Sequence, residues 1–214
     1  MRTSLVVGVI FILTSAMVLS ACGSAPKTPS STTAATAAPE VKQPVLYTGK
    51  NCMSQIANAA ARWQPDATPI HLESGLNAES NGQNGKSTIW QGMFASPSRG
   101  RWRSFTCSGS RLKEEPAIGV SGSMEMASSP ETAAAMFQPL LLIVDSDKAY
   151  ETAQEHGGAE LLKKNPEQPV LYSLNWDAKT RKLIWAIMYG TSHSDSKGVG
   201  LVDATSGKFL GASK

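Results

Sequence analysis

The sequence lacks the short motifs that mark the commonest catalytic and nucleotide-binding sites. It contains no G-x-S-x-G, no P-loop and no dinucleotide-binding fingerprint. Its three histidines are His71, His156 and His193, and none has the H-x-x-x-H or H-E-x-x-H spacing of a zinc site. We therefore expect a protein that is not an enzyme and that has neither a metal site nor another cofactor.

Two polar clusters are incomplete versions of known sites. The run from Asp145 to Asp147 begins like a calcium loop, but it lacks the glycine and the distal glutamate of an EF-hand. A helix cap is the better interpretation. Residues 191–196 collect serine, histidine and aspartate, yet a catalytic triad needs side chains that converge from separate elements. This segment is interpreted as a polar hairpin loop.

The sequence has little excess of either charge. The formal net charge is +3 at pH 7, and 17% of the residues are charged. Nucleic-acid-binding proteins concentrate charge on a strongly basic face, so we expect no nucleic-acid partner. One basic patch includes an aromatic residue: Arg99, Arg101, Trp102 and Arg103. It is a candidate interaction patch for anionic headgroups or an acidic partner; the alternative is a solvated strand edge protected by charge.

The apolar run near the N-terminus, residues 5–13, is too short to span a membrane, which takes about 20 residues. It follows Arg2 and precedes small residues, as in a secretory signal peptide. The four residues that end in Cys22, "LSAC", look like a bacterial lipobox. The resemblance implies cleavage before Cys22 and lipid attachment to its sulfur. The alternative is an ordinary signal peptide with an incidental cysteine.

Residues 23–46 are rich in serine, threonine, alanine and proline and poor in bulky apolar residues. Such a segment cannot bury enough surface to fold, so it is predicted to be a disordered tether. The chain is thus expected in the bacterial cell envelope, anchored to a membrane by lipid on Cys22. Gly23, in place of aspartate after the cysteine, favours the outer membrane.

Only three cysteines occur in the sequence, and assigning Cys22 to lipid leaves Cys52 and Cys107. An even pair in an oxidising compartment favours a disulfide. Cys52 lies on the apolar stripe of a predicted helix, and Cys107 alternates with Phe105 on a predicted strand, so both can face one core. The alternatives are two buried thiols or a redox pair, although no C-x-x-C motif supports the latter.

The sequence I-W-x-x-M-aromatic occurs twice, in "TIWQGMF" at 88–94 and "LIWAIMY" at 183–189. Each copy lies within a similar predicted order of helix, proline, strand, turn, Ile-Trp strand and strand. The sequence therefore predicts an α+β fold of two tandem helix-plus-antiparallel-sheet modules, 47–128 and 129–214. We expect Trp90 and Trp185 at equivalent buried positions, each packed on its own module's helix, near Trp63 in the first module and near Ala149 or Ala153 in the second.

The remaining expectations concern particular segments. The first helix is expected at 51–64, and a second at 145–158 that ends at a glycine pair, with a further short helix at 160–164. Alternation places Ile118, Val120, Met124 and Met126 on one face of a strand. Residues 128–144 are expected to form a helix followed by a buried strand or turn.

The C-terminal half, from the helix through "LIWAIMYG" to "VDATSGKFL", resembles a PepSY-type module. Its hairpin signature corresponds here to Asp203, Ser206, Gly207 and Lys208. The paired arrangement also resembles β-lactamase-inhibitor-protein-like domains. The resemblance implies helix-plus-sheet modules, cell-envelope proteins and proposed inhibition of peptidases, with no catalytic residues.

Two functions follow as expectations. The preferred one is a non-enzymatic envelope lipoprotein whose paired modules bind an unknown envelope protein or peptide, including a peptidase. The alternative is an assembly or ligand-holding accessory factor of the envelope with a pocket between the modules. The sequence does not indicate whether the two sheets pack face to face or edge to edge.

Overall fold

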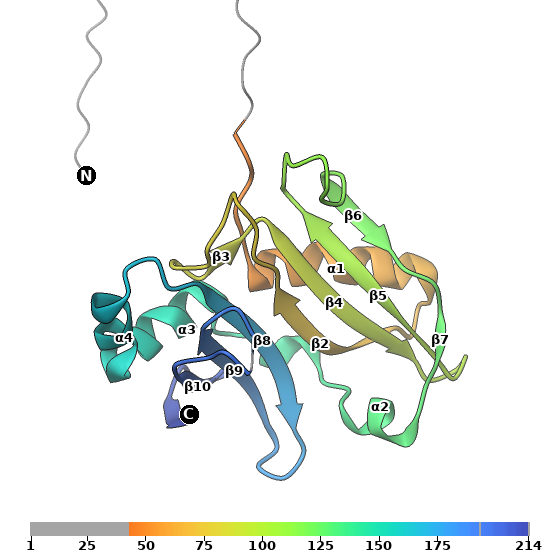
Figure 1. Ribbon diagram of the computed structural model, residues 1–214. Helices are drawn as coiled ribbons and strands as arrows, with labels where there is room; N and C mark the ends of the chain where they lie inside the picture. Colours follow the sequence, from red (N-terminus) through yellow and green to blue (C-terminus); the bar gives the residue numbers. More distant parts are fainter. Residues whose placement is uncertain (1–42, 193, 214) are drawn as a thin grey trace, which may run out of the picture. The chain divides into compact units, whose positions relative to one another are not determined.

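The computed structural model describes residues 43–192 and 194–213 (Figure 1). The predicted signal peptide, Cys22 and most of the predicted tether lie outside these residues. The last residues of the predicted tether belong to the folded part, because the Val45 amide donates a hydrogen bond of 2.9 Å to the Gly109 carbonyl. None of the helices in the described part is long and apolar enough to cross a membrane.

The predicted α+β class is confirmed. The helical segments are α1 (Gly49–Trp63), α2 (Pro130–Ala134), η1 (Pro139–Leu141), α3 (Ser146–Ala153), η2 (Gln154–Gly158) and α4 (Ala159–Lys164). The strands are β1 (Tyr47–Thr48), β2 (Thr68–Ser74), β3 (Lys86–Ser87), β4 (Ile89–Ser96), β5 (Arg101–Ser108), β6 (Gly119–Gly122), β7 (Met126–Ala127), β8 (Val170–Asp177), β9 (Lys182–Tyr189), β10 (Val199–Asp203) and β11 (Phe209–Ser213).

Nine of these strands form one antiparallel sheet in the order β11-β10-β9-β8-β2-β4-β5-β6, with β7 also paired to β5. The two sequence halves meet edge to edge, because β2 pairs with β8 through His71–Asn175, Leu72–Leu174 and Glu73–Ser173. Figure 1 shows α1 beside β2, β4 and β5, and α3 and α4 beside the β8–β10 part. Outward from the β2–β8 junction, each half contributes four strands in chain order: β2, β4, β5 and β6 on one side and β8, β9, β10 and β11 on the other.

The two tryptophans of the repeated sequence occupy matching positions in this sheet. The cross-strand neighbours are Ser74, Trp90 and Cys107 in one half and Leu174, Trp185 and Val202 in the other. Each indole N–H donates to the carbonyl of the residue before a helix N-cap: Trp90 to Tyr47 and Trp185 to Val144, both at 2.9 Å. Both side chains are 0% exposed.

The tryptophans contact each other as well as their own halves. Their ring centroids lie 6.2 Å apart in an edge-to-face arrangement, and Trp90 also lies 6.1 Å from Tyr172. The expectation that Trp90 packs near Trp63 is wrong, because Trp63 packs on Phe105 at the far end of α1. Because β2 pairs directly with β8, both indoles lie in one shared core rather than in two separate cores.

The N-termini of α1 and α3 meet above this pair. The Gly49 amide donates to Ser146 Oγ and the Lys50 amide to Asp145 Oδ1, both at 2.8 Å. A Cβ on Gly49 would lie 2.5 Å from the Trp185 ring, so only glycine permits this close approach. The side chains of the Asp145–Asp147 run thus cap helices, as the sequence analysis predicted.

Helix α1 begins at Gly49, with the Thr48 side chain accepting from the Asn51 amide, and ends before Pro65, which cannot continue a helix. Its buried stripe includes Cys52, Ile56 and Ala60. Cys52 and Cys107 form the predicted disulfide, with their Cα atoms 5.7 Å apart, and it joins α1 to β5.

One helical expectation in the second half needs correction in part. His156 and Gly157 have non-helical dihedrals and interrupt the helix at the glycine pair, but the chain resumes directly in α4. Gly157 adopts φ 108°, and a Cβ on Gly158 would lie 1.9 Å from the Tyr189 hydroxyl. The glycines therefore allow a kink against β9 rather than a stop.

Several apolar residues of the expected strand around residues 118–126 and of the 128–144 segment are exposed. Met124 is 87% exposed and Met126 53% exposed, because β6 ends at Gly122 and β7 is only two residues long. In the 128–144 segment, for which a helix followed by a buried strand or turn was expected, the short helix α2 is followed by a 3-10 turn, η1, in which Leu140 is 88% exposed. The end of this segment is fixed by the residue after β10, because the Ile143 and Val144 amides both donate to the Ala204 carbonyl.

Candidate functional site

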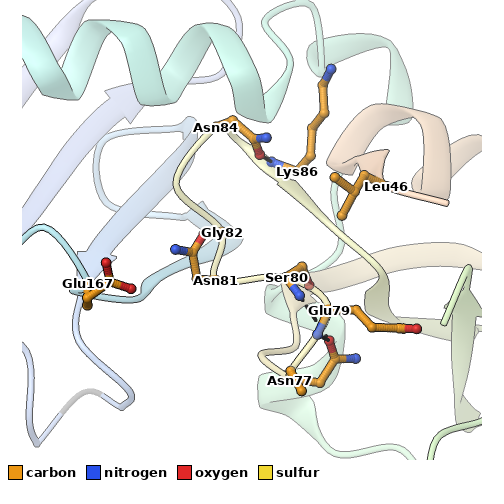
Figure 2. A pocket seen from close by; sticks show the side chains of 10 residues that line it. Leu46, Asn77, Glu79, Ser80, Asn81, Gly82, Asn84, Lys86 and Glu167 are labelled. Atoms are coloured by element: carbon orange, nitrogen blue, oxygen red, sulfur yellow. Dashed lines mark hydrogen bonds between the residues drawn. The ribbon is translucent and has the colours of Figure 1, made fainter. Parts of the chain in front are cut away.

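A polar pocket of about 350 Å³ lies between the two sequence halves (Figure 2). Its lining residues are Asn77–Gly82, Asn84, Lys86 and Leu46 from the first half and Glu167 from the second. The volume falls in the range of small-molecule sites in proteins. The alternative function, an accessory factor of the envelope, requires a pocket between the modules, which is where this one lies.

Most of the pocket is built by one long connection. Residues 75–88 join β2 to β4 and carry the short strand β3, whereas residues 178–181 join the corresponding strands β8 and β9. A turn as short as 178–181 is enough to connect such strands. Long connections in compact domains are frequently functional, and this one supplies nearly all the pocket's polar side chains.

The connection is tied to the second half by several hydrogen bonds. Gln83 Nε2 donates to the Gln168 carbonyl at 2.9 Å, and the Val170 amide donates to the Asn81 carbonyl at 2.8 Å. The buried Tyr172 hydroxyl donates to the Gly82 carbonyl and accepts from the Gly85 amide. Burial raises the pKa of Tyr172 well above its ordinary value, so this hydroxyl stays protonated and holds the loop.

Two glycines let the connection lie this close. Gly82 and Gly85 have φ values of 78° and 75°, in the left-handed region that favours glycine. A Cβ on Gly82 would lie 1.9 Å from the Val170 carbonyl oxygen, and one on Gly85 would lie 2.1 Å from Asp147 Cα. The pocket wall is thus fixed by backbone packing and does not depend on a ligand for its conformation.

Some polar side chains of the pocket already have hydrogen-bond partners within the protein. The Glu79 carboxylate accepts from the Ser110 hydroxyl at 2.6 Å and from the Arg111 amide at 3.0 Å. The Asn81 and Asn84 side-chain carbonyls accept from loop amides, at 3.1 Å each. Asn81, Asn84 and Glu167 are exposed to solvent, and among the described residues neither the NH2 groups of the two asparagines nor the charged ends of Lys86 and Glu167 have a protein partner.

The predicted interaction patch lies at the other end of β5. Arg101 is exposed, and Trp102 is half-buried. Arg99 forms an ion pair of 3.3 Å with Glu125, and Arg103 Nε donates to the Ser123 carbonyl at 2.6 Å. The structure thus brings the four predicted residues together at the sheet edge formed by β5 and β7.

Glu125 is the acidic residue at this edge, and it is already engaged. The Trp63 indole donates to its carboxylate at 2.7 Å. That hydrogen bond, followed by the charges of Arg99, Arg101 and Arg103, holds the pKa of Glu125 below its ordinary value. The edge therefore keeps an excess of positive charge beside the exposed methionines 124 and 126.

The histidines do not converge. His71 lies between Glu73 and Asn175 on the sheet, where burial lowers its pKa but hydrogen bonds to the oxygens of both residues outweigh burial and raise it. His156 stacks on Phe209 with the ring centroids 4.2 Å apart. His193 lies outside the described residues, and within those residues no cluster of three metal-ligating side chains occurs.

The hairpin signature has a structural role. The Asp203 carboxylate accepts from the Thr205 and Ser206 amides and pairs with Lys182. Although burial opposes ionisation, these hydrogen bonds hold the pKa of Asp203 below its ordinary value. Gly207 adopts φ 76° and donates to the Asp203 carbonyl. The signature therefore closes the β10–β11 turn.

No family model matches the chain, and no curated protein matches it. One solved structure is similar in fold, a crystal structure described as a "putative lipoprotein" from Clostridium difficile 630. It is 13% identical, covers 80% of this chain and 93% of its own, and has a TM-score of 0.48.

Proposed function

We propose that this chain is a non-catalytic lipoprotein of the bacterial cell envelope that is anchored through Cys22 and binds a protein or peptide partner. The signal-peptide pattern and the lipobox-like "LSAC" support the anchor. The outer membrane is the proposed location, because Gly23 follows the cysteine. The fold supports a binding role through the surface that it exposes at the β5–β7 edge.

The observation that carries the proposal is this arginine surface, defined as Arg99, Arg101, Trp102, Arg103, Met124 and Met126. The register pairs Arg101 with Ala127 and Trp102 with Met126. Because successive strand residues point to opposite faces, this edge carries Arg101 and Arg103 on one face and Trp102 with Met126 on the other. Arginine, tryptophan and methionine are enriched in protein interfaces. The partner that fits has acidic side chains interspersed with apolar ones.

The sheet edge offers a second mode of contact to the same partner. Within the described strands, β6 and β7 pair only with β5, which leaves their outer edges unpaired. An extended peptide can add to such an edge through backbone hydrogen bonds, while side-chain contacts give specificity. An acidic extended segment would thus combine strand addition with ion pairs to the arginines.

The two halves are proposed to be related PepSY-like modules. The matching tryptophan positions, the matching indole hydrogen bonds and the strand order outward from β2–β8 support a common origin. By that resemblance, a peptidase is one class of partner to be tested.

Cross-linking from the arginine surface tests the function. A photo-reactive residue at Met126 in the membrane-anchored protein should give one dominant cross-linked envelope protein. The Arg99→Glu/Arg101→Glu variant should lower its yield about tenfold or more, because each charged contact at an interface contributes on the order of 1.5–3 kcal/mol. The matched control is Lys163→Glu/Lys164→Glu, a charge reversal of equal size on the exposed end of α4.

The cross-linked peptide should be rich in aspartate and glutamate when mapped by mass spectrometry. An unchanged yield with the arginine variant would overturn the proposal. A dominant cross-link to lipid instead of protein would also overturn it, and would assign the surface to the membrane.

A further inference from the structure

We propose that the junction between the two halves of the sheet carries a proton-dependent latch, in which protonated His71 ties β2 to β8 and loss of the proton weakens that tie. The latch goes beyond the proposed function, because it concerns how firmly the two halves are joined, and it shares no residue with the arginine surface. Its evidence is a chain of four hydrogen-bonded side chains that crosses the junction: Glu73 and His71 on β2, and Asn175 and Ser173 on β8.

The ladder between β2 and β8 is shorter than the ladder beside it (Figure 1). On β2 it covers only His71–Glu73, whereas β8 and β9 pair along their whole lengths, Val170–Asp177 with Lys182–Tyr189. Cross-strand pairs are the unit of sheet stability, so a short ladder opens more easily than a long one. A side-chain hydrogen bond across this ladder therefore has a larger share in joining the halves than it would have elsewhere in the sheet.

The arrangement of the four side chains requires both ring nitrogens of His71 to donate. Asn175 Nδ2 donates to Ser173 Oγ at 3.2 Å, which leaves Asn175 Oδ1 facing His71 Nδ1 at 2.7 Å. An amide oxygen only accepts, and so does the ionised Glu73 carboxylate, which lies 3.2 Å from His71 Nε2. Only the imidazolium carries a proton on both nitrogens, so these contacts are satisfied by a charged His71.

A neutral His71 cannot keep the same contacts. With a single proton, one ring nitrogen directs its lone pair either at the Glu73 carboxylate or at the Asn175 oxygen. The second conflict is relieved if the Asn175 amide turns over and the Ser173 hydroxyl donates to it instead. Even then the bond across the junction joins two neutral groups, and such a bond is roughly half as strong as one from a charged donor.

The charges around His71 are few. Its register neighbour on β4 is Met93, whose own neighbour on β5 is Ser104, so the strands on that side bring no charge to the same face. The charged side chains on or beside this face near His71 are Glu73 on β2, Asp177 on β8, Lys182 on β9, Asp203 on β10 and Glu115 in the loop after β5. Lys182 pairs with Asp203, and Glu115 lines a cavity of about 260 Å³ together with Glu73. Among the described residues, Glu73 is the one that forms an ion pair with His71.

The direction of the pH dependence follows from these contacts. Burial lowers the pKa of His71, but the hydrogen bonds to Glu73 and Asn175 and the charge of Glu73 outweigh burial and raise it. Because the pKa in the folded chain is above that in the unfolded chain, the stabilisation is complete below about pH 6.5 and is lost as the pH rises through the folded-state pKa. At the acid end, the hydrogen bond from His71 lowers the pKa of Glu73, so the pair stays charged in mild acid. The junction should therefore be firmest in mild acid and weaker in mild alkali.

Two NMR measurements on the mature full-length chain carrying Cys22→Ser test the latch. Titration of the imidazole signals should show that His71 loses its proton above about pH 6.5, the value for a free histidine. Hydrogen exchange of the Leu72 and Leu174 backbone amides, corrected for intrinsic rates, should show about two- to fivefold greater protection near pH 5.5 than near pH 8.5. The expected factor is modest because the Glu73 side chain is 49% exposed and that of His71 22% exposed.

Variants assign the effect to the four side chains. His71→Gln and Asn175→Ala should each bring the ratio of protection between the two pH values close to one, because the first removes the proton and the second removes its acceptor across the junction. Glu73→Gln should lower the pKa of His71 toward that of a free histidine. The matched controls are His156→Gln, which removes a histidine away from the junction, and Glu115→Gln, which removes a carboxylate from the cavity beside Glu73. Both controls should behave like the parent chain.

Two results would overturn the proposal. One is loss of the His71 proton at or below the pH at which a free histidine loses it, since the junction would then not favour the charged form. The other is an undiminished ratio of protection in Asn175→Ala, since the proton would then act within β2 and not across the junction.

Discussion

The Trp90→Ala and Trp185→Ala variants should each lose about 3–5 kcal/mol of unfolding free energy, the usual cost of truncating a fully buried tryptophan. Both side chains are 0% exposed, and each indole N–H donates to a backbone carbonyl just before a helix start. Truncation leaves a cavity between the halves and an unpaired carbonyl. The loss is a large share of the stability of an ordinary domain.

Thermal unfolding of the two variants measures this effect. For a domain of this size, the melting temperature should fall by about 6–20 °C. Trp102→Ala is the matched control, because Trp102 is half-buried on the arginine surface and should lose much less. Native-like melting of both core variants would mean that the repeated tryptophans are not structural.

Reduction of the Cys52–Cys107 disulfide is the second large effect. The bond closes a sequence separation of 55 residues, for which the chain-entropy estimate is a contribution of about 4 kcal/mol. It links α1 to β5 and both cysteines are 0% exposed. Loss of the bond should therefore loosen the attachment of α1 to the first half of the sheet.

The measurement is denaturant unfolding with and without reductant. The midpoint should fall on reduction of the Cys22→Ser chain and should already be low in the further variant Cys52→Ser/Cys107→Ser. Reductant should leave that variant unchanged, which controls for other effects of the reagent. Equal stability of the oxidised and reduced chains would contradict a stabilising role for the bond.

Elements with a strong local pattern could be predicted from the sequence. The stripe that includes Cys52 and Ile56 predicted α1, and alternation predicted β9 around Trp185. The disulfide was predicted because Cys52 and Cys107 each occupy a core-facing position of a periodic pattern, and it is present. In these cases burial is periodic along the chain, and periodicity is visible in a single sequence.

Elements that depend on distant partners could not be predicted in the same way. The sequence left open how the two sheets join, and the β2–β8 pairing is decided by residues about a hundred positions apart. Met124 and Met126 alternate correctly, yet no element covers them. Leu140 belongs to an apolar run but projects outward, because the backbone of that segment is held by Ala204 rather than by a strand.

The two candidate sites also differ in how far they depend on contacts between residues distant in sequence. Four residues of the arginine surface could be proposed from the sequence, because three arginines and a tryptophan lie within five positions of each other, whereas the contribution of Met124 and Met126 could not. In the 75–88 connection, the two Asn-Gly pairs, Asn81-Gly82 and Asn84-Gly85, indicate a turn. Its pocket was not predicted, because Glu167 comes from a distant loop and because the commitment of Glu79 to Ser110 is a tertiary contact. The surplus of asparagines in a long connection was the signal available.

The proposed function depends most on attachment of this chain to a membrane through Cys22. The decisive measurement is intact-protein mass spectrometry of the membrane fraction, compared between the native chain and Cys22→Ser. We predict that the native protein begins at Cys22 and carries the added mass of acyl chains, while Cys22→Ser lacks that mass and is released or retains its leader. An unmodified N-terminus in the native protein, with the same membrane fractionation for both, would contradict the account.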